Sequence, residues 1–213
     1  MHPADCPDFD YANHRRHREI LADRTAAIVK ALRRRTIDTL VACQDSRSIH
    51  AHLFSDLTPP ECGYFAGHYR GEDFRCLKFY RVIVPGDPRV GSMPESVGVE
   101  MVSIATAIRE AIEALDSLHR DRHVTPSDRL VTAVKVACST LEAVLRVHPY
   151  ANGNGHACRF IVWATLGRYG YWPRNWPIEP RPPDPPYTAA IVQYRNGDPV
   201  PLEEFVLTNL VPS

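Results

Sequence analysis

Lysine is scarce in this 213-residue chain: only three of its 25 basic residues are lysines. No apolar run approaches the roughly 18 residues of a membrane-spanning helix, and the first 20 residues lack the apolar core of a signal peptide. The 25 basic and 25 acidic residues balance to a formal charge of zero, so no overall field draws the protein onto nucleic acid or an anionic membrane. These absences predict a cytoplasmic protein with no membrane attachment and no direct nucleic-acid binding.

No C-x-x-C pair occurs among the six cysteines, and none of the histidine pairs has a nearby third ligand of the type that structural zinc needs. We therefore expect reduced, mostly buried thiols, exposed helix histidines and no zinc site. The cysteines are Cys6, Cys43, Cys62, Cys76, Cys138 and Cys158, and the histidine pairs are His14 with His17, His50 with His52, and His119 with His123.

The remaining composition is that of one folded domain, because 44% of the residues are hydrophobic and the length suits a single core. Helical periodicity is the main secondary-structure signal. It predicts helices over about 13–35, 37–54, 96–118, 126–147, 155–169, 186–194 and 202–210.

Two segments depart from this helical pattern. Aromatic and β-branched residues from Phe79 to Val84, followed by Pro85-Gly86-Asp87-Pro88, predict a β-hairpin. Seven prolines between 172 and 187 exclude a helix or a central strand there. That stretch is either a rigid packed connection, which its tryptophans favour, or a polyproline ligand for a partner. The predicted fold is mainly α with one β-hairpin.

The chemistry is concentrated in residues 148–159, HPYANGNGHACR, which lie between two predicted helices. Gly153 and Gly155 permit positive φ and carry no Cβ, so the N–H groups of 153–156 can form a concave nest for an anion. The next helix directs its N-terminal donors to the same point. Arg159 lies one turn inside that helix and can reach back over the nest to clamp a phosphate.

His148 ends the preceding helix on the other side of the nest. Its side chain can take a proton from a hydroxyl that attacks a bound phosphate. A histidine in this place can also be a simple helix cap, but the neighbouring nest and arginine favour catalysis.

The same twelve residues resemble the signature of the Fic (Fic/Doc, or Fido) family, H-P-F-x-D/E-G-N-G/K-R-x-x-R. The match covers His148, Pro149, the aromatic Tyr150, Gly153, Asn154, Gly155 and Arg159. Further similarity lies in Gly67-His68-Tyr69-Arg70, in the predicted hairpin and in Gly197-Asp198. The resemblance implies a Fic-like domain over 58–213, preceded by an N-terminal helical extension over 1–57 that packs with it as one globular unit.

The resemblance also implies an activity: transfer of AMP from ATP to a Ser, Thr or Tyr hydroxyl of a target protein. In that scheme His148 is the general base and the hairpin is a flap whose Val82–Val84 strand pairs with the target. Phosphate contacts would come from Gly153, Asn154, Gly155, His156 and Arg159.

Two residues depart from the family pattern. Asn152 replaces the acidic residue that ligates Mg²⁺, so the metal should be weakly held. His156 replaces an arginine, which leaves Arg159 as the one permanent cation of the motif.

Two other functions stay open: a kinase like the Doc toxins, disfavoured by the two glycines, and a pseudoenzyme that binds a nucleotide or protein without turnover, favoured by Asn152. The sequence shows no inhibitory glutamate motif of the family. We therefore expect either a separate antitoxin-like inhibitor or no need for one.

Overall fold

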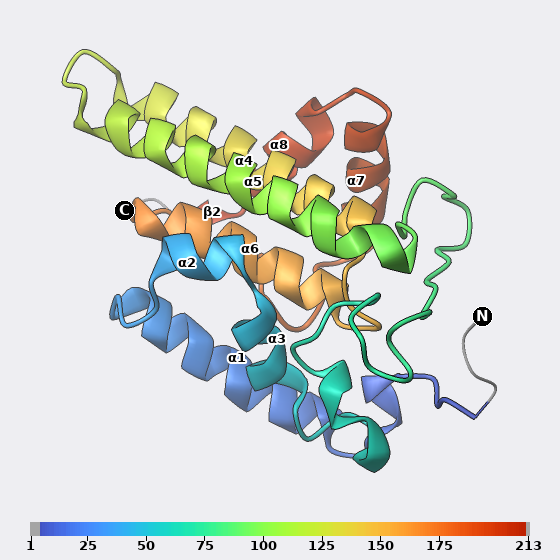
Figure 1. Cartoon of the computed structure of the whole chain (residues 1–213). Coiled ribbons are helices and arrows are strands. Elements are labelled where there is room, and N and C mark those ends of the chain that lie inside the picture. Colours follow the sequence, from blue (N-terminus) through green and yellow to red (C-terminus); the bar gives the residue numbers. More distant parts are fainter. Residues whose placement is uncertain (1–4, 212–213) are drawn as a thin grey trace.

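The computed structural model describes residues 5–211, and these are mainly helical (Figure 1). Two short 3₁₀ turns, Tyr11–Asn13 and Pro60–Phe65, accompany the α-helices. The α-helices are α1 (His17–Arg33), α2 (Thr39–Gln44), α3 (Arg47–Phe54), α4 (Pro94–Arg120), α5 (Pro126–Val147), α6 (Asn154–Arg168), α7 (Tyr187–Arg195) and α8 (Val200–Thr208).

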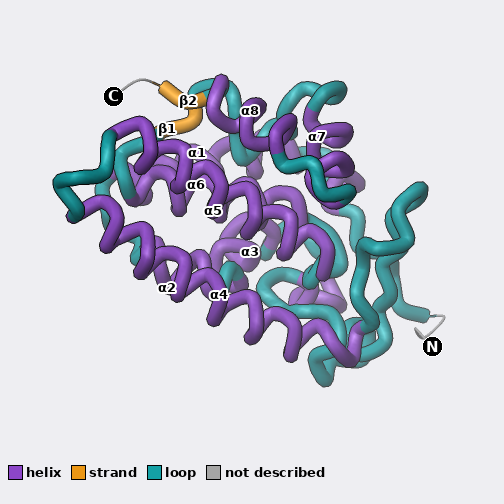
Figure 2. Tube along the Cα trace, turned by 90° about the horizontal axis from the view of Figure 1, so that it is seen from above, coloured by secondary structure: helices purple, strands orange, loops and turns teal. Residues whose placement is uncertain are grey.

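Helix α6 is the centre of the molecule, because every residue from 156 to 167 is buried. A helix that is buried all round needs neighbours on every side. Helix α5 packs along one side of α6 and is itself flanked by the long α4, while α1, α2 and α3 pack against α6 elsewhere (Figures 1 and 2). The motif of residues 148–159 therefore joins the two most centrally packed helices.

One hydrophobic core runs through both parts of the expected domain division. Leu21 and Phe54, from the first 57 residues, belong to the same buried cluster as Leu141 and Phe160. The first three helices thus share a core with the rest of the chain.

The predicted helices are confirmed, apart from the one expected over 37–54, which is two helices. Asp45 lies between α2 and α3 in an extended conformation, and its carboxylate accepts the backbone N–H of Arg47. This local turn competes with the helical hydrogen bond and restarts the chain in a new direction. Hydrophobic periodicity does not register such an interruption.

The predicted β-hairpin around 79–84 is not formed, because the described residues contain no strand between 78 and 93. The segment runs out and back as a loop, with a turn in which Asp87 donates to the Val84 carbonyl. The returning arm, at Gly91 and Ser92, donates instead to the carbonyls of Arg146 and Val147 at the end of α5. These bonds use the donors that a hairpin ladder would need, and the two prolines of the turn have no N–H to offer.

A two-residue antiparallel pair joins Trp172–Pro173 (β1) to Leu210–Val211 (β2), which the sequence did not predict. Between β1 and α7 the proline-rich stretch is packed. Trp176 is fully buried, and its carbonyl accepts the Trp163 indole N–H at 2.5 Å. The expectation of a packed connection is confirmed.

A disulfide between Cys6 and Cys76 corrects the expectation of reduced thiols, while the other four cysteines are free and buried. The bond joins residues 70 positions apart, which no spacing rule identifies from one sequence. In the described part of the chain, no helix is long and apolar enough to cross a membrane.

Candidate functional site

The loop between α5 and α6 is braced by its own side chains. His148 and Gly153 have φ values of +54° and +76° and turn the chain at the two ends of the loop. The Asn154 amide closes the loop: its oxygen accepts the Tyr150 N–H and its nitrogen donates to the Tyr150 carbonyl, both at 2.9 Å. The predicted phosphate contact of Asn154 therefore has a structural alternative, because the side chain is fully engaged in holding the loop.

The His148 ring has a fixed tautomer. Its Nδ1 lies 2.9 Å from the Leu145 carbonyl, which can only accept, so Nδ1 carries the proton and Nε2 has the lone pair. Burial lowers the pKa of His148, and the nearby cations Arg70 and Arg195 lower it further. The ring is thus neutral near pH 7, the state that a general base requires.

Arg70 ties this histidine to the 80–92 loop. Its guanidinium donates to the carbonyls of His148 at 2.7 Å, Val147 at 2.9 Å, Tyr80 at 3.1 Å and Ser92 at 3.0 Å. Burial lowers the pKa of Arg70 to about 10, which leaves it charged. The sequence offered this arginine only through the resemblance, because four carbonyls from distant segments leave no local pattern.

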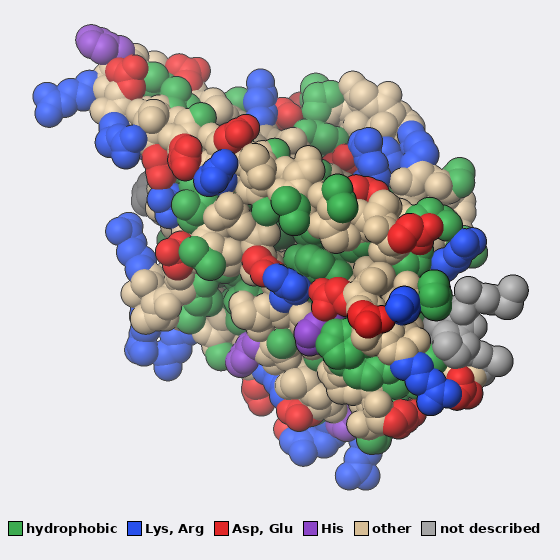
Figure 3. Space-filling view, viewed as in Figure 1, with side chains coloured by type: hydrophobic (Ala, Val, Ile, Leu, Met, Phe, Trp, Pro, Cys, Tyr) green, Lys and Arg blue, Asp and Glu red, His purple; other side chains and the backbone are tan. Residues whose placement is uncertain are grey.

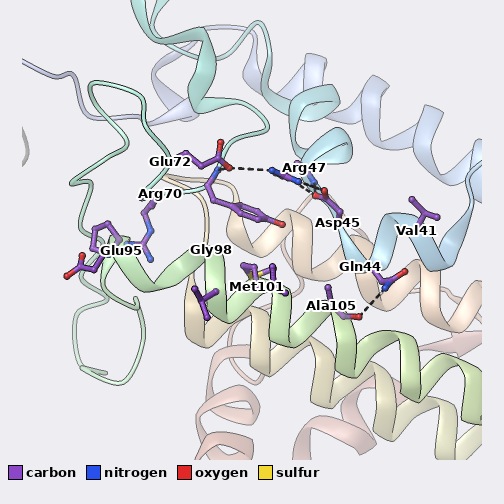
Figure 4. Close-up of a pocket in the computed structure, with 15 residues that line it drawn as sticks. Val41, Gln44, Asp45, Arg47, Arg70, Glu72, Glu95, Gly98, Met101 and Ala105 are labelled. Carbon is purple, nitrogen blue, oxygen red and sulfur yellow. Dashed lines mark hydrogen bonds and ion pairs between the residues drawn. The ribbon is translucent and has the colours of Figure 1, made fainter.

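A cavity of about 810 Å³ lies on the outer side of Arg70, between α2, α3 and the first turns of α4 (Figure 4). At its upper end Arg47 is held between Asp45, at 2.6 Å, and Glu72, at 3.5 Å. Val41, Gly98 and Met101 supply apolar lining (Figure 4). This cavity was not predicted, and it contains none of the motif residues 148–159.

Asn152 forms one contact that an ionised acid could not form. Its amide nitrogen donates to the Phe9 carbonyl at 2.8 Å, and its oxygen accepts the Gly153 N–H at 2.7 Å. A carboxylate has no proton to donate to a carbonyl. Asn152 thus fastens the N-terminal segment over the loop.

The residues around Asn152 do not suit Mg²⁺. Its oxygen is already hydrogen-bonded, and the carboxylate that faces the motif, Glu179, is 2.7 Å from the His156 ring. Magnesium favours anionic oxygen ligands. The described residues contain no group of three or more His, Cys, Asp or Glu side chains suited to a metal.

Gly153 is packed too closely for any other residue. A Cβ there would lie 2.4 Å from the Phe54 ring and 2.9 Å from His50 Nε2. His50 is fully buried, which corrects the expectation of an exposed histidine. Its Nδ1 accepts the Gly67 N–H at 3.0 Å, and its Nε2 lies 2.9 Å from the Asn152 carbonyl. His50 therefore supports the back of the loop.

Arg159 folds back toward the N-terminus of α6, as its position predicts. A Cβ on Gly155 would lie 2.9 Å from one guanidinium nitrogen of Arg159. The Arg159 Nε donates to the Ile178 carbonyl at 2.7 Å, which fixes the side chain against the proline-rich segment. The nest residues and Arg159 are therefore together in space.

The Glu179 carboxylate lies between the side chains of His156 and Arg159. One carboxylate oxygen lies 2.7 Å from His156 Nε2 and 3.9 Å from an Arg159 nitrogen. Burial opposes ionisation of Glu179, but the hydrogen bond from His156 and the charge of Arg159 outweigh it, so the pKa of Glu179 is lowered. Burial lowers the pKa of His156, so the ring is neutral near pH 7 and donates its Nε2 proton.

Two aromatic rings pack over the His156–Glu179 pair. Tyr11 and Phe54 contact the His156 ring edge-on at 5.4 and 5.3 Å between centroids. His156 and Arg159 are each 3% exposed, so solvent hardly reaches these two side chains. The sequence predicted the nest, but not its cover, because Phe9, Tyr11 and Glu179 come from segments with no motif.

Comparison with known proteins does not assign the chain to a family. No protein-family model matches the chain, and no curated protein matches it.

Proposed function

We propose that this protein transfers AMP from ATP to a Ser, Thr or Tyr hydroxyl of a target protein, with His148 as the general base. The observation that carries the proposal is the state of His148: neutral, with Nδ1–H bonded to Leu145 and the Nε2 lone pair available. It is supported by the adjacent turn at Gly153 and by Arg159 folded over Gly155.

In the proposed step, the target hydroxyl gives its proton to His148 Nε2 while its oxygen attacks the α-phosphorus of ATP. The bond from that phosphorus to the oxygen bridging the α- and β-phosphates breaks, and pyrophosphate leaves. The Asn154 and Gly155 amides begin α6 and have no partners within the helix, so they can hold phosphate oxygens. Arg159 neutralises charge on the outer phosphates.

Glu179 must move before ATP can enter, because its carboxylate would repel a phosphate beside Arg159. Once it leaves, His156 and Arg159 are both freed to face the nucleotide. The resting protein is accordingly expected to be slow.

The target would dock along the 80–92 loop. Ile83 is 84% exposed there, between Val82 and Val84, so a target chain can reach this segment, and pairing through backbone groups would not demand one target sequence. Arg70 bonds to the backbone of both this loop and His148, so one side chain positions the docking segment and the general base.

A second candidate is nucleotide or protein binding without turnover. The observation that favours it is Asn152, whose amide fastens the cover over the nest and does not suit a metal. A Doc-like kinase, which transfers the γ-phosphate, has weaker support because the nest keeps both glycines.

ATP labelled at the α- or the γ-phosphate distinguishes these functions. The protein is incubated with each label, a lysate and Mg²⁺ or Mn²⁺, and labelled proteins are separated on a denaturing gel. We expect α-label on protein. Label from the γ-phosphate alone would establish the kinase, and neither label, with nucleotide binding retained, would establish the pseudoenzyme.

A further inference from the structure

A second groove, separate from the nest, lies between α1 and residues 174–179 of the proline-rich segment. Its volume is about 730 Å³, within the size range of small-molecule sites. On the α1 side the groove is lined by the small side chains of Ala22 and Ala26, and on the opposite side by Trp163 and Pro177. The groove is thus wide enough for a flat ring and bounded by apolar surface.

Four cations surround the groove: Lys30, Arg33, Arg34 and Arg174. None of them forms an ion pair with any described residue; Arg33 lies over the Trp172 ring at 5.3 Å. In Figure 3, Lys and Arg side chains project from the edge of the molecule at which α1 ends. Unpaired positive charge gathered around one cavity attracts a polyanion.

The carboxylate that borders the groove does not neutralise it. Glu179 directs an oxygen to His156, 2.7 Å away on the motif side. The groove and the nest therefore meet at Glu179, but their cations are different residues.

An unpartnered hydroxyl marks the α1 wall. The Thr25 side chain borders the groove, is 93% buried, and its Oγ1 has no hydrogen-bond partner among the described residues. A buried hydroxyl without a partner is costly, so a hydrogen bond to a ligand in the groove would remove that cost. This feature is independent of the four cations.

We propose that this groove binds an organic polyphosphate with a flat aromatic ring, the chemistry of a nucleoside diphosphate. The ring packs between Ala22, Ala26 and Trp163, and the phosphates lie among Arg33, Arg34 and Arg174. The site uses neither His148 nor the nest, so it does not rest on the proposed transfer reaction.

Titration calorimetry with ADP, AMP, adenosine and pyrophosphate tests the site on the full chain. We expect ADP to bind more tightly than each of the others, because only ADP offers both the ring and two phosphates, and its affinity should fall as salt is raised. The variant R33Q/R174Q should weaken ADP at least about tenfold, since each arginine gives a charge-assisted contact. Its matched control, R109Q/R122Q, removes two exposed arginines elsewhere and should stay within about twofold.

Thr25→Val keeps the shape of the α1 wall and removes the hydroxyl. It should weaken ADP by several-fold while leaving the melting temperature of the free protein equal or higher, because the unpartnered group is gone. If affinity is unchanged in both R33Q/R174Q and Thr25→Val but lost in Arg159→Ala, ADP binds at the nest and the proposal is wrong. No binding of ADP, or tighter binding of single-stranded RNA than of ADP, would also overturn it. Failure of AMP transfer would leave all these binding results unchanged, so the two proposals fail separately.

Discussion

At the scale of single residues, His50 is a buried group whose protonation opposes the fold. Its two ring nitrogens are committed to the Gly67 N–H and the Asn152 carbonyl, so a second ring proton would face a donor. Burial lowers the pKa of His50 to about 3. The unfolded chain takes up this proton near pH 6.5, whereas the folded chain does not.

Stability should therefore be full above pH 6.5 and fall as the pH drops toward 3, by roughly 3–5 kcal/mol from this group alone. A glutamine side chain can accept the Gly67 N–H and donate to the Asn152 carbonyl, and it has no proton to gain in this pH range. In His50→Gln, urea denaturation measured from pH 7 to 4 should show a shallower decline than in the parent. His123→Gln, an exposed control in the turn after α4, should follow the parent. Equal pH slopes in all three proteins would show that His50 does not govern acid stability.

Asn152 supports a second residue-scale prediction. In Asn152→Asp, the donor to the Phe9 carbonyl is replaced by a negative oxygen, so a hydrogen bond becomes a repulsion. We expect a loss of about 1–3 kcal/mol in the free energy of unfolding and faster proteolysis within residues 5–13. Asn152→Ser, which keeps a donor, should lose less. An aspartate variant as stable and as protease-resistant as the parent would rule out this fastening role.

At the scale of elements, Arg70 holds the 80–92 loop in place through hydrogen bonds, which the predicted hairpin ladder would otherwise have supplied. It joins the 80–92 loop to the end of α5 through carbonyls of both. Arg70→Met fills a similar volume but leaves four carbonyls without their donor, which should lower stability by at least about 3 kcal/mol. Protease cleavage should first appear between 80 and 93. If Arg70→Met unfolds outright, Arg70→Lys, with fewer donors, should still show that cleavage pattern; resistance of the loop in both variants would contradict this role.

The N-terminal segment depends on a covalent link. The disulfide from Cys6 to Cys76 closes a loop of about 70 residues, for which chain entropy gives a stabilisation of about 4 kcal/mol at most. A reductant should lower the melting temperature of the parent and bring it to that of Cys6→Ser. The melting temperature of Cys6→Ser should not respond to reductant, because Cys76 has no partner left in this variant. A parent indifferent to reductant would mean that the bond does not contribute.

The helices could be predicted from sequence because each has a local cause. Pro126 opens α5, as the sequence predicts, and the helix ends at Val147, where its end was expected; in the structure the Thr125 side chain caps its start and left-handed His148 follows its end. The hairpin prediction failed because the cause is remote. The returning arm of the 80–92 loop bonds to α5 at Gly91 and Ser92, and no local pattern distinguishes that arrangement from a hairpin.

At the scale of the whole molecule, the motif residues were predictable and their surroundings were not. Gly153, Asn154 and Arg159 lie within one loop and one helical turn, so their proximity follows from backbone geometry. Phe9 and Glu179 reach the site from distant segments, and the bond from Cys6 to Cys76 holds the segment that carries Phe9. Only the packed fold brings them together, and they change an open nest into a covered one.

In the proposed function, His148 is a general base beside a phosphate nest that Glu179 keeps closed. Transfer of α-label from ATP to protein tests it, measured for the parent, Glu179→Gln, and Glu179→Gln combined with His148→Ala. Glutamine has nearly the size of glutamate but does not repel phosphate, so Glu179→Gln should transfer faster than the parent. Adding His148→Ala should reduce that rate by about 10²–10⁴, because the base acts on the hydroxyl proton, while the affinity for ATP stays unchanged. Transfer that persists without His148, or no transfer when Glu179 is neutral, would contradict the account.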